Sequence, residues 1–341
     1  MRVTVVGGGV TGLATAAALA QHAGVQVTVV AARRGQCPPN ALWECPPYKI
    51  EPAGLACKWA IATFKDFLAL SEKHPDIAAV KRLYYLIRHG DTSTETQETL
   101  TSLALHATRD SYINYSACAL DEDSLARVLG PTRHARFSGA HAYDSVVVNT
   151  RAYLSFLEKK AKERGVRIVR GHVDSLNAEQ LRGADVIVVA AGLRSGALVG
   201  DEDVVPVRGQ VVHVAAPDID VSLADLTTGA YVIPPVSAQE GTLECGGTAD
   251  VGVSSREPSS DDTERIMRGC RDMIPTLHNV PCEDVWVGVR PSRKTGVRVD
   301  SSRLPDGRLL VCAYGTGGAG YTCSFGLAHH VVALVVGQAR L

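Results

Sequence analysis

The N-terminal segment joins a short apolar strand to a helix through a glycine-rich turn, and this feature constrains the fold more than any other. The strand is expected at Val3–Val6, and Gly7-Gly8-Gly9-Val10-Thr11-Gly12 follows it with the pattern Gly-x-Gly-x-x-Gly. Gly7 allows the tight turn, Gly9 lets the backbone approach a pyrophosphate, and Gly12 lets the helix pack closely on the strand. The segment therefore predicts a Rossmann-type nucleotide-binding unit, with the pyrophosphate at the helix N-terminus.

The end of the second strand does not distinguish between the nucleotides that such a unit could bind. Val25–Ala31 follows the helix expected at Val10–His22 and is predicted to be a parallel strand. Ala32 stands where an acidic residue usually binds the ribose, and Arg33 and Arg34 come next. Three interpretations stay open: a ribose held by backbone or by Arg33, a 2′-phosphate held by the arginines of an NADP enzyme, or a solvated basic corner.

Two further glycine-bearing segments favour a flavin. The apolar strand Asp185–Ala191 is short enough to be buried on both faces of a parallel sheet, and Gly192 follows it. Near the C-terminus, the turn Gly315–Gly320 separates a strand expected at Leu309–Ala313 from a helix expected at Cys323–Val336. Small residues in such a turn let the backbone approach a planar ring. Three glycine sites spread along the chain indicate one extended cofactor that touches all three.

Strand-like and helix-like patterns alternate along the rest of the chain, which predicts an α/β fold. With 341 residues, two lobes around one cleft are expected. Residues 205–285 are expected to supply most strands of the second lobe. The other expected elements are helices at Lys58–His74, Asn149–Gly165 and Asp261–Met273, and strands at Val166–Arg170 and Val173–Leu176.

Composition argues against several other classes of protein. The 35 basic and 36 acidic residues leave a net charge of -1, so no nucleic-acid partner or anionic membrane surface is expected. No apolar stretch approaches the ~20 residues of a membrane helix, and the strand-like start without a leader favours synthesis in the cytosol. Nine cysteines without a Cys-x-x-Cys pair indicate reduced thiols, and neither a disulfide framework nor a metal site is expected.

Taken together, these features resemble the D-amino-acid oxidase family of flavoproteins. The resemblance is strongest in Val5–Thr15, Asn40–Trp43, Val207–Gln210, Tyr231–Pro234, and Val287–Pro291 with Gly315–Thr322. It implies FAD as cofactor and two lobes interleaved in the sequence. The FAD-binding lobe is then expected over 1–80, 141–200 and 286–341, and a substrate lobe of mixed and antiparallel strands over 81–140 and 201–285.

The resemblance also implies the roles of individual residues. Arg290 would pair with the substrate carboxylate through its planar fork, Tyr231 would contact the same carboxylate, and the Gly318 carbonyl would receive the substrate amine. The glycine turns and the resemblance together predict flavin contacts at Gly7, Gly9, Val10, Thr11, Gly12, Arg33, Val173, Gly192, Gly317, Gly318, Ala319, Gly320 and Thr322.

The chain departs from the family pattern in its substrate region. A second active-site tyrosine of the family has no match, because Thr227 and Ala249 stand at the two places where it occurs. Relatives that act on acidic D-amino acids carry extra arginines there, whereas Leu223–Ala230 contains no basic residue. Neutral or apolar D-amino acids are therefore the expected substrates.

The implied reaction is hydride transfer from the substrate Cα to the flavin, followed by reoxidation by dioxygen to give hydrogen peroxide. Oxidation of glycine, sarcosine or another secondary amine, and flavin binding without turnover, are the alternatives. Ala339-Arg340-Leu341 is similar to the tripeptide recognised by the peroxisomal import receptor, so a peroxisomal location is expected. The sequence leaves the oligomeric state open, with a homodimer as one candidate.

Overall fold

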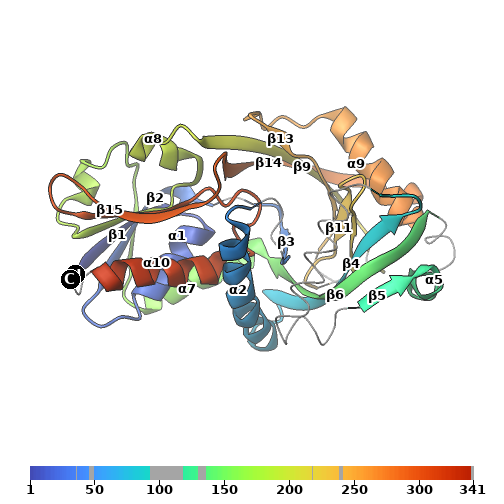
Figure 1. The fold of residues 1–341 in the computed structure, drawn as a ribbon, viewed down its shortest axis with the longest axis horizontal. Helices are drawn as coiled ribbons and strands as arrows, with labels where there is room; N and C mark the ends of the chain where they lie inside the picture. The colour runs from blue at the N-terminus through green and yellow to red at the C-terminus, as the bar shows by residue number, and fades with distance from the viewer. Residues whose placement is uncertain are drawn as a thin grey trace.

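The computed structural model describes residues 1–35, 37–45, 50–92, 118–129, 136–216, 218–237 and 241–338, and of Arg33, Arg34, Leu129 and Gln338 it describes only the backbone. The molecule has two lobes, each built on one sheet (Figure 1). None of the described helices combines the length and apolarity needed to span a bilayer. The nine cysteines are free thiols.

The first lobe contains a six-stranded sheet in the order β15-β16-β8-β1-β2-β7. All neighbours are parallel except β15 and β16. The strands are β1 (Arg2–Gly8), β2 (Gln26–Arg34), β7 (Arg167–Arg170), β8 (Val186–Val189), β15 (Arg298–Arg303) and β16 (Leu309–Tyr314). Because β1 and β8 lie in the middle of the sheet, both are apolar and buried along most of their length.

Helices cover both faces of this sheet. On one face lie α1 (Val10–Leu19), α7 (Thr150–Glu163) and α10 (Ser324–Gln338), and on the other lies α8 (Ser195–Val199), as Figure 1 shows. Leu19 of α1 and Val331 of α10 share one buried cluster with Val5 and Val188 of the sheet. Helix α2 (Ala53–Lys73) packs against α10 between the two lobes. This arrangement confirms the predicted Rossmann-type lobe.

The second lobe contains a ten-stranded mixed sheet. Its main path runs β13-β9-β12-β11-β10-β4-β6-β3, with β14 paired to β9 and β5 paired to β6. The pairs are antiparallel except β10 with β4. The strands are β3 (Asn40–Leu42), β4 (Ala78–Arg88), β5 (Cys118–Asp121), β6 (Phe137–Asn149), β9 (Val204–Val214), β10 (Ser222–Asp225), β11 (Tyr231–Ile233), β12 (Leu243–Gly246), β13 (Asp250–Val251) and β14 (Cys282–Arg293).

Helices cover the outer face of the second sheet. The amphipathic helix α9 (Ser260–Met273) packs Ile266 and Met273 against Val212 and Cys245 of the sheet. Helix α5 (Glu122–Leu129) lies at the β5 and β6 edge (Figure 1). Short 3-10 turns occur at Glu179–Leu181, Gly192–Arg194 and Pro275–Asn279.

Two details of the fold differ from the sequence prediction. The strand predicted at Val173–Leu176 is wrong, because the chain leaves the sheet edge after the pairing of Arg170 with Ala31 and finds no further strand to join. Strands of the larger sheet also continue past the residues at which the sequence analysis placed the boundaries between the two lobes. Strand β6 extends to Asn149 and β14 to Arg293, although residues 141–200 and 286–341 were expected in the FAD-binding lobe.

Candidate active site

The turn between β1 and α1 is built from three glycines with different steric roles. Gly7 has φ +132° and a Cβ there would lie 2.1 Å from the Ala190 carbonyl oxygen. A Cβ on Gly12 would lie 2.1 Å from the Gly7 carbonyl oxygen, whereas one on Gly9 would meet no protein atom within 4 Å. Two glycines therefore serve close packing, and Gly9 opens onto free space, as expected for a pyrophosphate-binding turn.

The N-terminus of α1 has no capping side chain, because Gly9 occupies the cap position. The first amide groups of the helix are therefore available to an anion, and the helix dipole adds a partial positive charge at the same place. This is the local chemistry that a dinucleotide pyrophosphate requires.

A cavity of about 350 Å³ extends from this turn between the glycine segments. Its wall is formed mostly by backbone and small side chains. The predicted cofactor residues that line it are Gly7, Gly9, Val10, Thr11, Val173, Gly192, Gly317, Gly318 and Gly320. The structure thus brings together three glycine segments that are separated by more than a hundred residues in the sequence, as one extended cofactor would require.

Three of the predicted cofactor residues lie behind this wall, and one cannot be placed. Gly12 packs against Gly7, Ala319 is buried in the core of the first lobe, and Thr322 donates from its hydroxyl to the Leu42 carbonyl at 3.5 Å. These three position the wall and do not line the cavity. The side chain of Arg33 lies outside the described residues.

Several residues of the cavity wall were not anticipated from the sequence. Ala32 lines the cavity, and no acidic side chain is among the described residues of its wall. Other unanticipated wall residues include Gly35, Cys37, Gly171, His172, Ala190, Ala191, Arg194 and Tyr321. For most of them the sequence signal is a position shortly after a strand, because ligands in open α/β sheets bind beyond the carboxyl ends of strands.

A network around Asp201 holds the C-terminal glycine turn against β14. The Asp201 carboxylate accepts hydrogen bonds from Arg293 Nε at 2.8 Å and from the Tyr314 hydroxyl at 2.7 Å. The Gly317 amide donates to the Pro291 carbonyl at 3.0 Å. The end of β14, the end of β16 and the turn between β16 and α10 are thus joined at one side of the cavity.

This network predicts a specific loss of stability in acid. Burial opposes ionisation of Asp201, but the hydrogen bonds from Arg293 and Tyr314 outweigh it and lower its pKa to about 2. The folded-state pKa lies below the unfolded value of about 3.9. The contribution of the ionised Asp201 to the free energy of unfolding is therefore complete above about pH 4 and is lost as the pH falls towards 2. Asp201→Asn should lower the free energy of unfolding at pH 7 by about 2 kcal/mol.

Urea unfolding at several pH values measures this effect. The difference between the wild type and Asp201→Asn should be largest at neutral pH and shrink between pH 4 and pH 2. The exposed Asp76→Asn is the matched control and should show little difference at any pH. A constant difference over the whole pH range would contradict the assigned role of the Asp201 charge.

Arg290 lies where the cavity meets the second lobe. Its neighbours Val289 and Pro291 line the cavity, and its Nη1 donates to the Thr248 carbonyl at 2.8 Å. A Cβ on Gly209 would lie 2.2 Å from Arg290 Nη1, so the guanidinium lies directly over this glycine. Among the described residues the Arg290 side chain has no other hydrogen bond or ion pair. The remainder of its fork is therefore free to bind a carboxylate.

Gly318 and Tyr231 lie near this guanidinium. A Cβ on Gly318 would be 3.5 Å from Arg290 Cδ, which places the glycine turn beside the arginine side chain. The Tyr231 ring covers Gly246, where a Cβ would lie 2.0 Å from Tyr231 Cζ. Burial raises the pKa of Tyr231, and the Glu244 carboxylate raises it further, while Arg290 lowers it. The Tyr231 phenol therefore stays protonated and can donate a hydrogen bond.

A buried Glu244 and His213 pair on the neighbouring strands was not anticipated from the sequence. His213 Nε2 and Glu244 Oε2 lie 3.8 Å apart, too far for a hydrogen bond. The Glu244 carboxylate instead accepts a hydrogen bond from the backbone amide of Asn40 at 3.4 Å. Burial raises the pKa of Glu244. Because Asn40 also donates from its side-chain amide to the Thr242 carbonyl at 3.3 Å, these contacts fasten β3 to β12 next to the substrate region.

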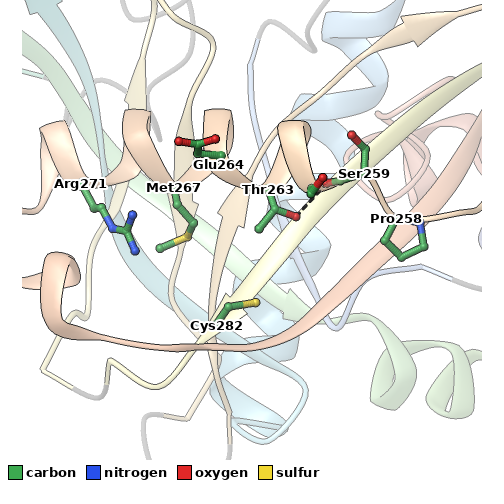
Figure 2. A pocket seen from close by; sticks show the side chains of 8 residues that line it. Pro258, Ser259, Thr263, Glu264, Met267, Arg271 and Cys282 are labelled. Atoms are coloured by element: carbon green, nitrogen blue, oxygen red, sulfur yellow. Dashed lines mark hydrogen bonds between the residues drawn. The ribbon is translucent and has the colours of Figure 1, made fainter.

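A second hollow, of about 410 Å³, lies on the outer face of the larger sheet along α9. Figure 2 shows Met267, Arg271 and Cys282 around it. Thr263 Oγ1 donates to the Ser259 carbonyl at 3.0 Å and so serves the helix start. None of the predicted site residues lines this wide, shallow hollow. The cavity at the glycine turns therefore carries the functional assignment, because it extends from the anion-binding turn to Val289 and Pro291, the residues on either side of Arg290.

The comparisons with known proteins agree with this geometry. Residues 2–334 match the model of the DAO family, described as "FAD dependent oxidoreductase". The chain belongs to this family, and FAD is its cofactor. This excludes the NADP interpretation of Arg33 and Arg34. The cavity fits FAD, since it offers an uncapped helix N-terminus and glycine backbone along its length.

Characterised relatives and solved structures cover nearly the whole chain. It is 32% identical to a D-amino-acid oxidase of Streptomyces coelicolor, over 97% of this chain and 96% of the relative. It is 31% identical to a D-amino-acid oxidase of Rubrobacter xylanophilus, over 98% of this chain and 95% of the relative.

Solved structures share the fold at lower identity. A glycine oxidase of Bacillus cereus has a TM-score of 0.79 at 19% identity, over 99% of this chain and 95% of its own. An L-proline dehydrogenase of P. horikoshii has a TM-score of 0.81 at 16% identity, over 99% of this chain and 93% of its own.

Proposed function

We propose that this protein is a D-amino-acid oxidase. The observation that carries the proposal is the Arg290 guanidinium, which lies over Gly209 beside Gly318 with most of its fork unused by the described residues. A carboxylate is the group that such a fork binds best. Two relatives above 30% identity over almost their full length are D-amino-acid oxidases, which supports the same substrate class.

The residues of this chain would act by positioning the substrate. Arg290 binds the α-carboxylate, Tyr231 donates a hydrogen bond to it, and the Gly318 carbonyl accepts one from the α-amine. Three fixed points allow only one enantiomer to present its Cα–H towards the cofactor. FAD, when bound, accepts two electrons and a proton as hydride and passes them on to dioxygen. Overall, a D-amino acid, dioxygen and water give a 2-oxo acid, ammonia and hydrogen peroxide, and no side-chain base is needed.

A visible spectrum of the purified protein tests the proposal. The protein should absorb near ~450 nm, where oxidised flavin absorbs. Under anaerobic conditions the band should bleach with D-alanine, D-methionine or D-phenylalanine and persist with the L-forms, and air should restore it. Bleaching by glycine or sarcosine alone would replace the proposal with a glycine-oxidase activity. A flavin band that no amine bleaches would indicate binding without turnover.

Three sequence predictions extend this proposal and stay predictions. Neutral or apolar side chains are expected because Thr227 and Ala249 offer no positive charge to an acidic substrate. The import signal Ala339-Arg340-Leu341 lies outside the described residues. Peroxisomal import would suit an enzyme that releases hydrogen peroxide, and microscopy of the tagged chain with and without the tripeptide would test it. A homodimer remains one candidate for the assembly.

A further inference from the structure

Strand β9 faces one extra residue where its partner changes from β12 to β13. The last pair between β12 and β9 joins Gly246 to Val211. The first pair between β13 and β9 joins Asp250 to Arg208. Three residues of the chain lie between Gly246 and Asp250, but two lie between Arg208 and Val211 on β9. Such a β-bulge changes the direction of backbone and side-chain groups, often next to a functional site.

Thr248, in the middle of this bulge, contacts both β9 and Arg290. Its hydroxyl oxygen accepts a hydrogen bond from the Gln210 backbone amide at 2.9 Å. A side-chain oxygen thus takes the place that a backbone carbonyl holds in a regular antiparallel ladder. The Thr248 carbonyl is therefore left for Arg290, whose Nη1 donates to it at 2.8 Å. Because Thr248 is 4% exposed, water does not compete effectively for either bond.

These contacts fix the orientation of the guanidinium group. Its flat face lies over Gly209, where a Cβ would be 2.2 Å from Arg290 Nη1 and 2.6 Å from Nη2. Gly318 lies along the stem of the same side chain, since a Cβ there would be 3.5 Å from Cδ and 3.6 Å from Nε. Rotation of the guanidinium would break the bond from Nη1 to Thr248. Orientation matters here, because a planar fork binds a carboxylate through two parallel hydrogen bonds.

A buried polar network holds β9 from the outer face of the sheet. Arg208 and Gln210 flank Gly209, so their side chains point to the face opposite the Arg290 guanidinium. They are 5% and 0% exposed. Arg208 Nη1 pairs with Asp262 of α9 at 2.7 Å and with Asp250 of β13 at 3.2 Å, and its Nη2 donates to Gln210 Oε1 at 2.8 Å. Three elements are thus joined directly behind Gly209.

The Gln210 side chain joins the same segment to the start of α9. Its Nε2 donates to the Ser259 carbonyl and to Thr263 Oγ1, both at 2.8 Å, and its Oε1 accepts from the Ser259 amide at 2.9 Å. Figure 2 shows Ser259 and Thr263 at this helix start. The side chains of Arg208 and Gln210 lie outside the described wall of the cofactor cavity. Their contacts therefore serve to fix the strand on which Thr248 and the guanidinium rest.

We propose that Thr248, held by the network of Arg208 and Gln210, is a positioning residue that aims the Arg290 guanidinium at the substrate carboxylate. The inference rests on the proposed D-amino-acid oxidase function. Without the Thr248 hydroxyl, Arg290 still offers a positive charge to the carboxylate, but it no longer holds the substrate in one orientation relative to the flavin. Loss of orientation slows the reaction of the bound substrate more than it weakens binding.

Thr248→Val tests the hydroxyl group, because valine keeps the shape of threonine but cannot accept the hydrogen bond from Gln210. Anaerobic stopped-flow reduction with D-methionine should show a limiting rate lowered by about 10- to 100-fold, with the apparent substrate Kd changed by less than about threefold. Thr248→Ser retains the hydroxyl and should react at close to the wild-type rate. Equal losses in the two variants would assign the effect to methyl packing and overturn the proposal, as would a weaker Kd at an unchanged limiting rate.

A double-mutant cycle with Arg290→Met shows whether Thr248 acts through the guanidinium. In the Arg290→Met background, Thr248→Val should lower the rate of flavin reduction no further, because no guanidinium is left to orient. Effects of the two substitutions that multiply would mean that Thr248 acts on another part of the site. That result would overturn the proposal.

Asp262→Asn tests the network from the outer face and leaves Thr248 unchanged, which covers the case in which Thr248→Val does not fold. It removes one ion pair of Arg208 and keeps the pair with Asp250. The limiting rate should fall by roughly 2- to 30-fold, again with little change in substrate Kd. Asp261→Asn is the matched control, since Asp261 is exposed in the same first turn of α9 and is not a partner of Arg208. Equal rates in these two variants would overturn the role of the network.

The wild type distinguishes failure of this inference from failure of the proposed function. If no D-amino acid reduces the flavin of the wild type, the proposed function fails and the role of Thr248 fails with it. If D-methionine reduces the wild type and Thr248→Val equally fast, the role of Thr248 alone fails. Titration of the oxidised, FAD-loaded protein with the 2-oxo acid product, 4-methylthio-2-oxobutanoate, gives a readout without turnover. Its Kd should be similar in the wild type and in Thr248→Val, and a large increase in the variant would make Thr248 a binding residue and overturn the proposal.

Discussion

Replacing Arg290 by methionine is expected to lower kcat/KM for D-methionine by roughly 10²- to 10⁴-fold, since removing one member of a desolvated charge pair costs about 2–5 kcal/mol. Methionine preserves much of the length and apolar contact of arginine but cannot bind a carboxylate. Most of the loss should appear in the step that reduces the flavin. FAD content should be retained, because the cavity is lined by Val289 and Pro291 on either side of Arg290 and not by Arg290 itself.

Stopped-flow measurement of flavin bleaching under anaerobic conditions gives the rate and the apparent substrate Kd separately. Arg290→Lys should also be strongly impaired, because an ammonium group cannot reproduce the bidentate geometry of a guanidinium. The exposed Arg167→Met serves as control and should behave like the wild type. If Arg290→Met reduced flavin at nearly the wild-type rate, the carboxylate would have to bind elsewhere.

Substitution of two glycines in the first turn should separate folding from cofactor binding. Gly12→Ala is expected to lower the free energy of unfolding by about 3 kcal/mol or more, because its Cβ would meet the backbone carbonyl of Gly7 at 2.1 Å. Gly9→Ala should cost the apoprotein about 1 kcal/mol or less, because no protein atom lies within 4 Å of the added Cβ. The Gly9 methyl group would instead occupy space needed by the pyrophosphate and weaken FAD binding by about 100-fold, or roughly 3 kcal/mol.

Thermal unfolding of the two apoproteins and titration with FAD measure the two effects independently. The exposed Gly24, which has φ +77° and no atom near its Cβ, provides Gly24→Ala as a control for backbone strain without contact. FAD binding by Gly9→Ala at wild-type affinity would show that the pyrophosphate does not approach this glycine. Equal destabilisation of the Gly9 and Gly12 variants would contradict the distinction between packing and open space.

The cofactor half of the site could be predicted because its determinants are local. The turn from Gly7 to Gly12 is set by steric limits that act within a few residues, and a strand followed by Gly192 carries the same kind of signal. The structure confirms the Rossmann-type lobe and places both segments at one cavity. The prediction was less accurate at the C-terminal glycine turn. Ala319 and Thr322 were expected to contact the flavin, but they pack behind the cavity wall and do not line it.

The substrate half could be inferred only through the resemblance. Arg290, Tyr231 and Gly318 carry no local pattern that identifies them as one site, and they come close only because β14, β11 and the C-terminal turn meet. Nothing in the sequence indicates that Gly209 must lack a side chain so that the Arg290 guanidinium can lie over it. The Val207–Gln210 stretch acquires a physical meaning only from this contact.

By itself, the sequence determined the α/β class and the nucleotide-binding turn and favoured a flavin, because backbone sterics and apolar periodicity act over short distances along the chain. Only the tertiary structure decided which side chains share one face of the larger sheet. Tyr85 and Tyr231 are far apart in sequence, and the register of β4, β10 and β11 brings the two phenols onto the same face. Electrostatic forces depend on distance through space and on burial, and neither is encoded in a local pattern of residues.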